Sequence, residues 1–334
     1  MGVGGLTANE RSAFDRLGYV VKGSVFTAAD LASLRAALEQ IVAEQAERLA
    51  AAGKLDETYS EAGFERRLAL IWEHNADAGA AIAQVITGKH GGGYDGAPIL
   101  AMIRHEPLLD CIRELVGSSI IGSSVYRIRP KVSGVPRGEV PWHQDSGYLL
   151  AHCDRHLIVT CWIPLVDATV ANGCLYVIPG AHRNGILRHY TEGSNGYLEV
   201  LAEELPGTQP VPVPMAAGDA LLMTNLTPHA SFANSTDVVR WSIDLRYQGA
   251  EVPNNVDEDP VTYVPEREPV TMACYPPEAD FVIRDPTAPE REVATAAQFH
   301  RARARYEQAK PFAPGRGWVS HPSRRGSGPA QADC

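Results

Sequence analysis

The sequence lacks the features that direct a chain into or across a membrane. Its 334 residues contain no apolar run of about 18 residues, the minimum for a membrane-spanning helix. The N-terminus, MGVGGLTANERSAF, has neither the basic nor the apolar segment of a signal peptide. Leu6 stands where a myristoylation motif requires Ser or Thr. We therefore expect a cytoplasmic protein with no membrane partner.

Paired cysteines and a P-loop are also missing. The six cysteines form no Cys-x-x-Cys pair and have irregular spacing, so no disulfide framework is expected. The glycine-rich segment 89–96 lacks the GxxxxGK[ST] spacing of a P-loop. We assign this segment no phosphate-binding role.

An excess of basic residues is absent as well. The chain has 30 Lys and Arg against 40 Asp and Glu, and its net charge of -10 disfavours binding to nucleic acid. The mean charge does not fix the charge of a substrate, because an active site can differ from the rest of the surface. With 45% hydrophobic and 21% charged residues, the composition is that of a soluble globular protein. Nothing in it indicates an oligomeric state.

The N-terminal part of the chain, residues 8 to about 118, has mostly helical patterns. Apolar residues recur at helical spacing along Leu31–Leu49, and Thr27 is in place to cap this helix. Further helices are expected over Glu65–Ile86 and Pro107–Val116.

The character of the sequence changes to β-strand after residue 119. Val239–Tyr247 alternates, with Trp241, Ile243, Leu245 and Tyr247 on one face and Arg240, Ser242, Asp244 and Arg246 on the other. Asn172-Gly173 predicts a hairpin and Gly218-Asp219 another turn. Short strands between turns, preceded by helices, predict a mainly β fold with a helical cover, either a β-sandwich or a jelly roll. The other expected strands are Ser119–Val132, His156–Val166, Cys174–Ile178 and Ala220–Thr224.

A histidine and an aspartate lie two residues apart in the stretch Pro141–Leu149, which reads PWHQDSGYL. If this stretch is extended, His143 and Asp145 project to the same face. A nitrogen and a carboxylate oxygen on one face suit two neighbouring positions of an octahedral metal. The pair alone is weak, because His-x-Asp occurs by chance in many proteins.

A third ligand and a cation follow later in the chain. His229 comes just after the expected strand Ala220–Thr224, and Arg240 begins the polar face of the alternating strand. Two histidines and one carboxylate make the facial triad of non-haem Fe(II) oxygenases. An arginine suits a two-pronged grip on a carboxylate, as the co-substrate 2-oxoglutarate requires. Ser242 shares the face of Arg240 and is in position to assist it.

With these residues in place, the chain resembles the phytanoyl-CoA dioxygenase (PhyH-like) family of Fe(II)/2-oxoglutarate-dependent oxygenases. The resemblance covers roughly residues 120–250 and, more loosely, the N-terminal helices. It implies a double-stranded β-helix (jelly roll or cupin-like) core at about 119–250. We expect one such domain over 1–322. Composition predicts a C-terminal loop and helix from about 251 within it, and a disordered tail at 323–334. The phrases that carry the resemblance are Arg129-Pro-Lys131, Trp142-His-Gln-Asp145, Thr160-Cys-Trp162, Asn172-Gly-Cys-Leu175, Pro179-Gly-Ala-His182, Gly218-Asp219, and His229-Ala-Ser231 with Asn234 and Arg240.

The resemblance further implies roles for single residues. His143, Asp145 and His229 are expected to bind Fe(II), and Arg240 the distal carboxylate of 2-oxoglutarate. Trp162 matches a tryptophan that lines the co-substrate pocket in relatives. Thr160 lies on the same strand face as Trp162 and is in position to donate a hydrogen bond. Arg127 lies where relatives have another contact to the co-substrate. Arg127, Arg129 and Lys131 would share one strand face, which is either a charged pocket wall or a solvated edge.

Candidate contacts to the substrate are weaker. Tyr148 lies beside the iron ligands, although a packing role is equally open. Gln144 lies between two ligands and would face outward. His74 faces either the substrate or the surface of a helix. His189 has no partner spacing and is interpreted as a surface or loop residue.

The resemblance implies an oxygenase that uses Fe(II), 2-oxoglutarate and O2 and releases succinate and CO2. In halogenating relatives a small residue replaces the carboxylate, so Asp145 favours hydroxylation, or desaturation or cyclisation, of a small molecule. A natural-product intermediate is one candidate. Two other classes stay open, a redox-neutral metal-dependent isomerase and a non-catalytic binding module. Arg240 argues against the isomerase, because an enzyme without 2-oxoglutarate does not need an arginine there. The intact triad argues against the binding module, because a protein that has lost its metal does not need the ligands.

Overall fold

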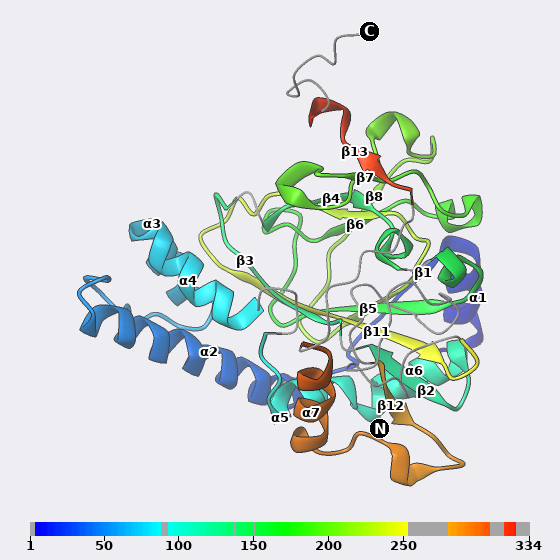
Figure 1. Cartoon of the computed structure of the whole chain (residues 1–334), viewed down its shortest axis with the longest axis horizontal. Helices are drawn as coiled ribbons and strands as arrows, with labels where there is room; N and C mark the ends of the chain where they lie inside the picture. The colour runs from blue at the N-terminus through cyan, green and yellow to red at the C-terminus, as the bar shows by residue number, and fades with distance from the viewer. Residues whose placement is uncertain are drawn as a thin grey trace, which may run out of the picture.

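Two antiparallel β-sheets face each other at the centre of the structure (Figure 1). This computed structural model describes residues 4–87, 93–123, 125–135, 138–149, 151–252, 280–307 and 317–324. Two facing sheets with strands exchanged between them form a jelly roll, so the predicted fold class is confirmed.

The two sheets differ in size. Within the described ranges, the larger sheet has seven strands, in the order β1 (Tyr19–Lys22), β9 (Ala220–Thr224), β5 (Ile158–Pro164), β11 (Arg240–Gly249), β2 (Ile120–Ser123) and β12 (Asp280–Arg284), with β3 (Arg127–Lys131) also on β11. The smaller sheet has the order β4 (Val140–His143), β10 (His229–Ser231), β6 (Leu175–Val177) and β8 (Val211–Val213). A separate short pair joins β7 (Tyr190–Thr191) to β13 (Val319–Ser320).

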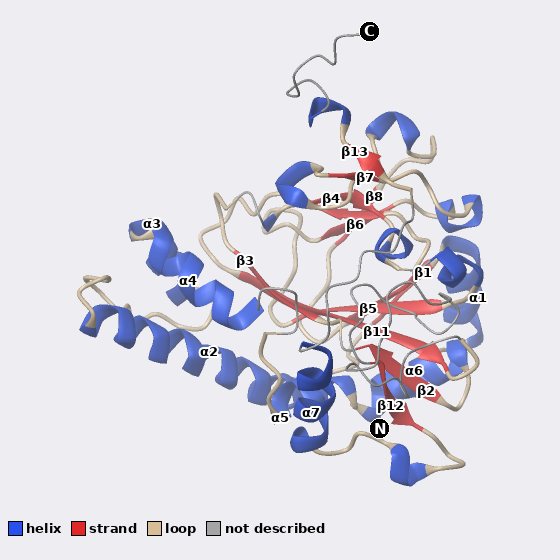
Figure 2. Cartoon of the chain, viewed as in Figure 1, coloured by secondary structure: helices blue, strands red, loops and turns tan. Residues whose placement is uncertain are grey.

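Helices cover the outer face of the larger sheet, away from the smaller one (Figure 2). The apolar face of β11, formed by Trp241, Ile243, Leu245 and Tyr247, belongs to the same buried cluster as the helices. These helices are α1 (Ala8–Leu17), α2 (Ala28–Ala51), α3 (Arg67–His74), α4 (Ala76–Thr87), α5 (Ala97–Ile103), α6 (Glu106–Val116) and α7 (Ala296–Glu307).

The predicted helix Leu31–Leu49 lies within α2, and its predicted cap is present. The Thr27 hydroxyl accepts the backbone N–H of Asp30, and the Asp30 carboxylate accepts that of Thr27. This reciprocal pair satisfies two backbone donors that the first turn would otherwise leave free. Leu34 and Leu38 of α2 are fully buried.

The single helix expected over Glu65–Ile86 is two helices. Asn75 separates α3 from α4 with an extended backbone (φ -150°, ψ 94°). Its side-chain oxygen accepts the backbone N–H of Ala78 at 3.0 Å. A short polar side chain that can bond to nearby backbone favours such a break over continued helix.

Two further expectations were wrong, and one short strand was not foreseen. β12 lies where extended loop was expected, and β1 is a four-residue strand in a segment that is otherwise mostly helical, as predicted. Gly173 does adopt a turn conformation (φ +82°), but β5 and β6 on either side of it do not pair. The chain crosses from the larger to the smaller sheet at this turn instead of forming a hairpin.

The other face of β11 determines where the site lies. Arg240, Ser242, Asp244 and Arg246 point away from the helices, and three of them, all but Ser242, line a pocket between the two sheets. The predicted alternation is therefore confirmed, although both faces of this strand are buried.

No helix in the described ranges is long and apolar enough to cross a membrane. The expected cytoplasmic location, the absence of a nucleic-acid partner and the single-domain boundaries stay predictions. Of the expected tail, Ser323 and Arg324 belong to the short 3-10 helix Pro322–Arg324, and residues 325–334 lie outside the described ranges.

Candidate metal and co-substrate site

His143, Asp145 and His229 come together, and the two histidines line one end of the pocket between the sheets. Each offers one ligand atom, and these atoms all lie within 4.8 Å of one another. His143 ends β4 and pairs directly with His229, which begins β10. Asp145 lies just beyond the strand, at the start of the 3-10 helix Asp145–Tyr148. All three side chains are buried.

Both histidines are held in the form that binds a metal through Nε2. Nδ1 of His143 lies 2.9 Å from the carbonyl oxygen of Pro141, and Nδ1 of His229 lies 3.0 Å from that of Thr227. A carbonyl only accepts, so each Nδ1 carries the proton and donates it. The Nε2 lone pairs are therefore free. Burial, with the nearby His229, lowers the pKa of His143 well below its ordinary value and keeps it neutral.

Asp145 is ionised and firmly held. Burial alone would raise the pKa of its carboxyl group, but Arg246 outweighs this and holds the pKa well below its usual range. Arg246 donates from Nε to Oδ2 at 3.0 Å and from Nη2 to Oδ1 at 2.9 Å. Thr160 donates its hydroxyl proton to Oδ2 as well. Two histidine nitrogens and a carboxylate are the donor set that suits Fe(II).

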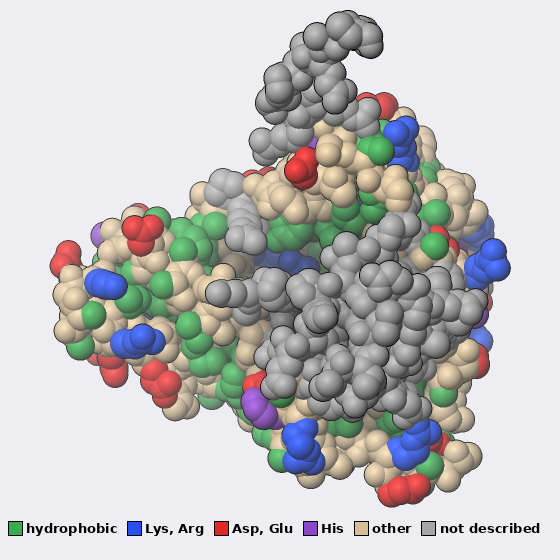
Figure 3. Space-filling view, viewed as in Figure 1, with side chains coloured by type: hydrophobic (Ala, Val, Ile, Leu, Met, Phe, Trp, Pro, Cys, Tyr) green, Lys and Arg blue, Asp and Glu red, His purple; other side chains and the backbone are tan. Residues whose placement is uncertain are grey.

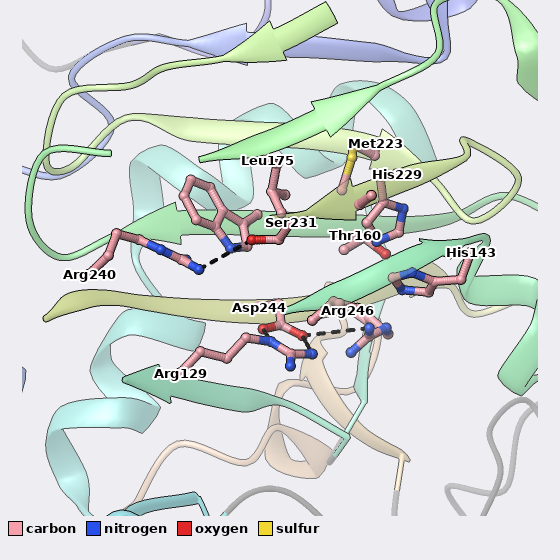
Figure 4. A pocket seen from close by; sticks show the side chains of 13 residues that line it. Arg129, His143, Thr160, Leu175, Met223, His229, Ser231, Arg240, Asp244 and Arg246 are labelled. Carbon is pink, nitrogen blue, oxygen red and sulfur yellow. Dashed lines mark hydrogen bonds and ion pairs between the residues drawn. The ribbon is translucent and has the colours of Figure 1, made fainter. Parts of the chain in front are cut away.

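Arg240 lies at the opposite end of the same pocket (Figure 4). Its Nη1 donates to the Ser242 hydroxyl at 2.6 Å, and its guanidinium carbon lies 5.1 Å from the centre of the Trp162 ring. The Nε atom is buried with no hydrogen-bond partner among the described residues. Burial, with Arg129 nearby, lowers the pKa of Arg240 to about 9. A buried cation with an unused donor fits an incoming carboxylate.

A second basic side chain lies close to Arg240. The Lys131 amino group donates to the Ser231 hydroxyl at 2.6 Å, and Nη2 of Arg240 reaches the same hydroxyl at 3.5 Å. Burial, followed by Arg240 and Arg129, lowers the pKa of Lys131 to about 6. Arg129 lines the pocket, so the charged-wall interpretation is correct for this residue. Lys131 is almost fully buried, which excludes a solvated edge there, but it is not part of the pocket lining.

The surface view agrees with this arrangement. Figure 3 shows a recess in which basic side chains are visible beneath hydrophobic ones. The apolar lining residues Leu175 and Met223 come from β6 and β9. A site with one apolar wall and convergent polar groups is typical of small-molecule binding.

The remaining predicted residues have varied positions. Arg127 lies opposite Asp244 in the sheet and donates to the backbone oxygen of Tyr126, but it is not part of the pocket lining. Tyr148 packs edge-on against His143, and its hydroxyl accepts the backbone N–H of Leu198 at 2.9 Å.

Gln144 and His74, two candidate substrate contacts, do not line the pocket. The Gln144 side chain is fully buried and bonds to the backbone of Gly185, Leu187 and Leu226. His74 lies on α3, largely exposed, with Nδ1 bonded to the carbonyl oxygen of Leu70.

Sequence patterns missed two residues next to the metal ligands. Arg246 was placed on the correct face of its strand, but no pattern indicated its pairing with Asp145. His189, expected in a loop or at the surface, is fully buried. Its Nε2 accepts the backbone N–H of Gln144 at 3.0 Å, so it cannot serve as a further ligand. It supports the backbone between His143 and Asp145 instead.

Comparison with known protein sequences identifies the family of this chain. The family model of phytanoyl-CoA dioxygenase (PhyH) matches residues 14–242, and the chain belongs to this family. A phytanoyl-CoA dioxygenase of Arabidopsis thaliana is 31% identical over 133 residues, which are 35% of this chain and 46% of that protein. A methylphosphonate hydroxylase of Gimesia maris is 30% identical over 156 residues, 45% of this chain and 54% of that protein. The chain thus spans about half the length of the curated relatives it matches.

A solved structure shares the fold. The non-heme monooxygenase ThoJ, in its apo form, superimposes with a TM-score of 0.53 at 22% sequence identity. The match covers 89% of this chain and 95% of that protein. At this identity the likeness supports the jelly-roll fold and no more.

Proposed function

We propose that this chain is a non-haem Fe(II)/2-oxoglutarate-dependent dioxygenase that hydroxylates an unactivated C–H bond of a small molecule. One observation carries the proposal. The two histidines of a buried His-Asp-His set line one end of a pocket, and at its other end lies a buried arginine whose Nε has no partner in the described part of the chain. The first end suits Fe(II) and the second suits the distal carboxylate of 2-oxoglutarate.

The proposed roles follow from the contacts. His143, Asp145 and His229 hold Fe(II), and Arg240 binds the distal carboxylate while Ser242 fixes the guanidinium. When bound, iron and 2-oxoglutarate supply the oxidative step, in which O2 is consumed and succinate and CO2 are released. The protein holds these partners, leaves the Nε2 lone pair of each histidine available and excludes water from a site whose ligands are all buried.

Other residues shape the pocket. Trp162 forms a wall under the Arg240 guanidinium and so limits where a carboxylate can lie. Tyr148 has its hydroxyl oxygen occupied by a backbone N–H, which leaves its hydroxyl proton free to donate. We propose that Tyr148 reaches the substrate from beside His143, and that Thr160 acts through Asp145 instead of through the co-substrate.

The aspartate bears on the outcome of the reaction. Asp145 fills the ligand position that a halide would need, and Arg246 and Thr160 hold it there. This supports hydroxylation, or desaturation or cyclisation at the same site, over halogenation. The unused Nε of Arg240 supports a carboxylate co-substrate, which a redox-neutral isomerase would not need.

Substrate-dependent succinate release tests the proposal. The purified protein with Fe(II), 2-oxoglutarate and O2 is screened against small molecules, and natural-product intermediates are the first group to try. We expect one group of compounds to raise succinate release above the uncoupled background and to gain one oxygen atom in mass spectra. His143→Ala should show neither effect. Turnover that does not depend on 2-oxoglutarate would overturn the proposal.

A further inference from the structure

Both oxygens of the Asp145 carboxylate already have hydrogen-bond donors. Oδ2 accepts from Nε of Arg246 at 3.0 Å and from the Thr160 hydroxyl. Oδ1 accepts from Nη2 of Arg246 at 2.9 Å. Each oxygen of an ionised carboxylate offers about two lone-pair sites. Oδ2 is therefore saturated, and Oδ1 has one site left.

The remaining site on Oδ1 is the one near the histidines. Oδ1 lies 3.9 Å from Nε2 of His143, and that Nε2 also has a free lone pair. A metal ion held between the histidines would therefore meet Oδ1. Oδ2 could bind a metal only if Thr160 or Arg246 gave up its hydrogen bond.

Arg246 itself has little freedom to move. Its Nη1 donates to the backbone oxygen of Val125 at 3.0 Å, and its Nη2 lies 3.6 Å from Oδ2 of Asp244. Asp244 in turn accepts two bonds from Arg129, at 2.7 and 3.2 Å. The side chains of Arg129, Asp244 and Arg246, with alternating charges, lie side by side along the pocket (Figure 4). A guanidinium fixed in this way sets the plane of the carboxylate that it grips.

We propose that Arg246 and Thr160 are positioning residues that make Asp145 a metal ligand through Oδ1 alone. The inference rests on the proposed function, because it assumes that a divalent metal occupies the triad. The new element is that Arg246 and Thr160, which do not contact the metal themselves, determine how many Asp145 oxygens bind it. Partners of this kind orient a ligand, and their loss typically lowers metal affinity by about 10- to 100-fold.

Metal binding without turnover tests this inference. Co(II) is titrated into the metal-free protein, with its visible ligand-field spectrum as the readout, for wild type, Arg246→Lys, Thr160→Val and Thr160→Ser. Lysine keeps the charge of Arg246 but cannot span two oxygens. We expect Arg246→Lys and Thr160→Val to weaken Co(II) binding by about 10-fold or more and to change the spectrum. Thr160→Ser keeps the hydroxyl and should match wild type.

Arg104→Lys is the matched control. Arg104 is comparably buried and also combines a carboxylate, Glu292 at 3.0 Å, with backbone oxygens, those of Ile283 and Val293. It lies outside the pocket lining. Its replacement should lower the thermal unfolding midpoint without changing the Co(II) affinity or spectrum.

The outcomes separate the two proposals. If wild type binds no Co(II), or binds it equally after His143→Ala, the metal centre of the proposed function is wrong. If wild type binds at the triad but Arg246→Lys and Thr160→Val match it in affinity and spectrum, the positioning inference alone is overturned. Thr160→Val is nearly isosteric, so it decides the inference even if Arg246→Lys does not fold.

Discussion

His143 and His229 lie directly opposite each other on the antiparallel strands β4 and β10, with ring centres 4.2 Å apart. Each ring donates Nδ1–H to the carbonyl oxygen of the residue two positions earlier in the chain. The two strands thus present two Nε2 lone pairs toward one point, and Asp145 completes the set from the turn that follows β4.

Removal of either histidine should abolish tight metal binding. For His143→Ala we expect the Co(II) affinity to fall by more than the roughly 100-fold upper figure for a residue that only supports a ligand. Isothermal titration calorimetry measures this directly. His74→Ala is the control, because His74 is an exposed histidine on α3, outside the pocket lining. Equal loss in both variants would contradict the assignment.

Arg240 should dominate the affinity for 2-oxoglutarate. Arg240→Lys loses the fork that fits a carboxylate, and truncation of one partner of a buried charged pair costs about 2–5 kcal/mol. The dissociation constant of 2-oxoglutarate should therefore rise by at least about 30-fold, since about 1.4 kcal/mol is tenfold. Ser242→Ala should have a smaller effect. Co(II) affinity measured without 2-oxoglutarate should stay unchanged, and a parallel loss of metal would indicate misfolding instead.

Binding of 2-oxoglutarate should take up a proton at neutral and alkaline pH. Burial, Arg240 and Arg129 lower the pKa of Lys131 to about 6, against weaker opposing effects of Glu139 and Cys174. Lys131 is thus mostly neutral above pH 6 in the free protein, and a carboxylate nearby would raise its pKa. The affinity should be constant below that pH and fall as the pH rises through the window between the free and bound pKa values.

Calorimetry at saturating metal, in buffers of different ionisation enthalpy, measures this proton uptake. Lys131→Met should remove both the uptake and the pH dependence. Release of a proton by wild type would be the opposite of the expected sign.

Gly218 should be intolerant of any side chain. Its φ is +87°, and an added Cβ would collide with the backbone oxygen of Phe26. A non-glycine residue in that conformation costs about 1–3 kcal/mol before the collision is counted. Gly218→Ala should therefore lower the thermal unfolding midpoint by several degrees. Gly207→Ala, where nothing lies within 4 Å of the added atom, should leave the midpoint unchanged.

The alternation along β11 could be predicted because a period of two follows from strand geometry alone. That period placed Arg240 and Arg246 on one face. The pairing of Arg246 with Asp145 could not be predicted, because it depends on how the turn after β4 meets a strand of the other sheet. Spacing along the chain carries no information on such a contact.

Two strands, β1 and β12, could not be predicted from local sequence patterns. β1 is only four residues long, Tyr19–Lys22, and lies between two well-capped helices. It is stabilised as a strand by pairing with β9, which is remote in sequence. β12 follows a segment rich in Pro, Asp and Glu, and its strand character comes from pairing with β2. Tertiary contacts outweighed local propensity in both cases.

The most direct test of the central claim is the visible spectrum after anaerobic addition of Fe(II) and 2-oxoglutarate. We expect a weak charge-transfer band that requires both additions and is absent from His143→Ala. Arg240→Lys should need more 2-oxoglutarate to reach the same intensity. If wild type binds Fe(II) but shows no band at any concentration of 2-oxoglutarate, the co-substrate assignment is contradicted.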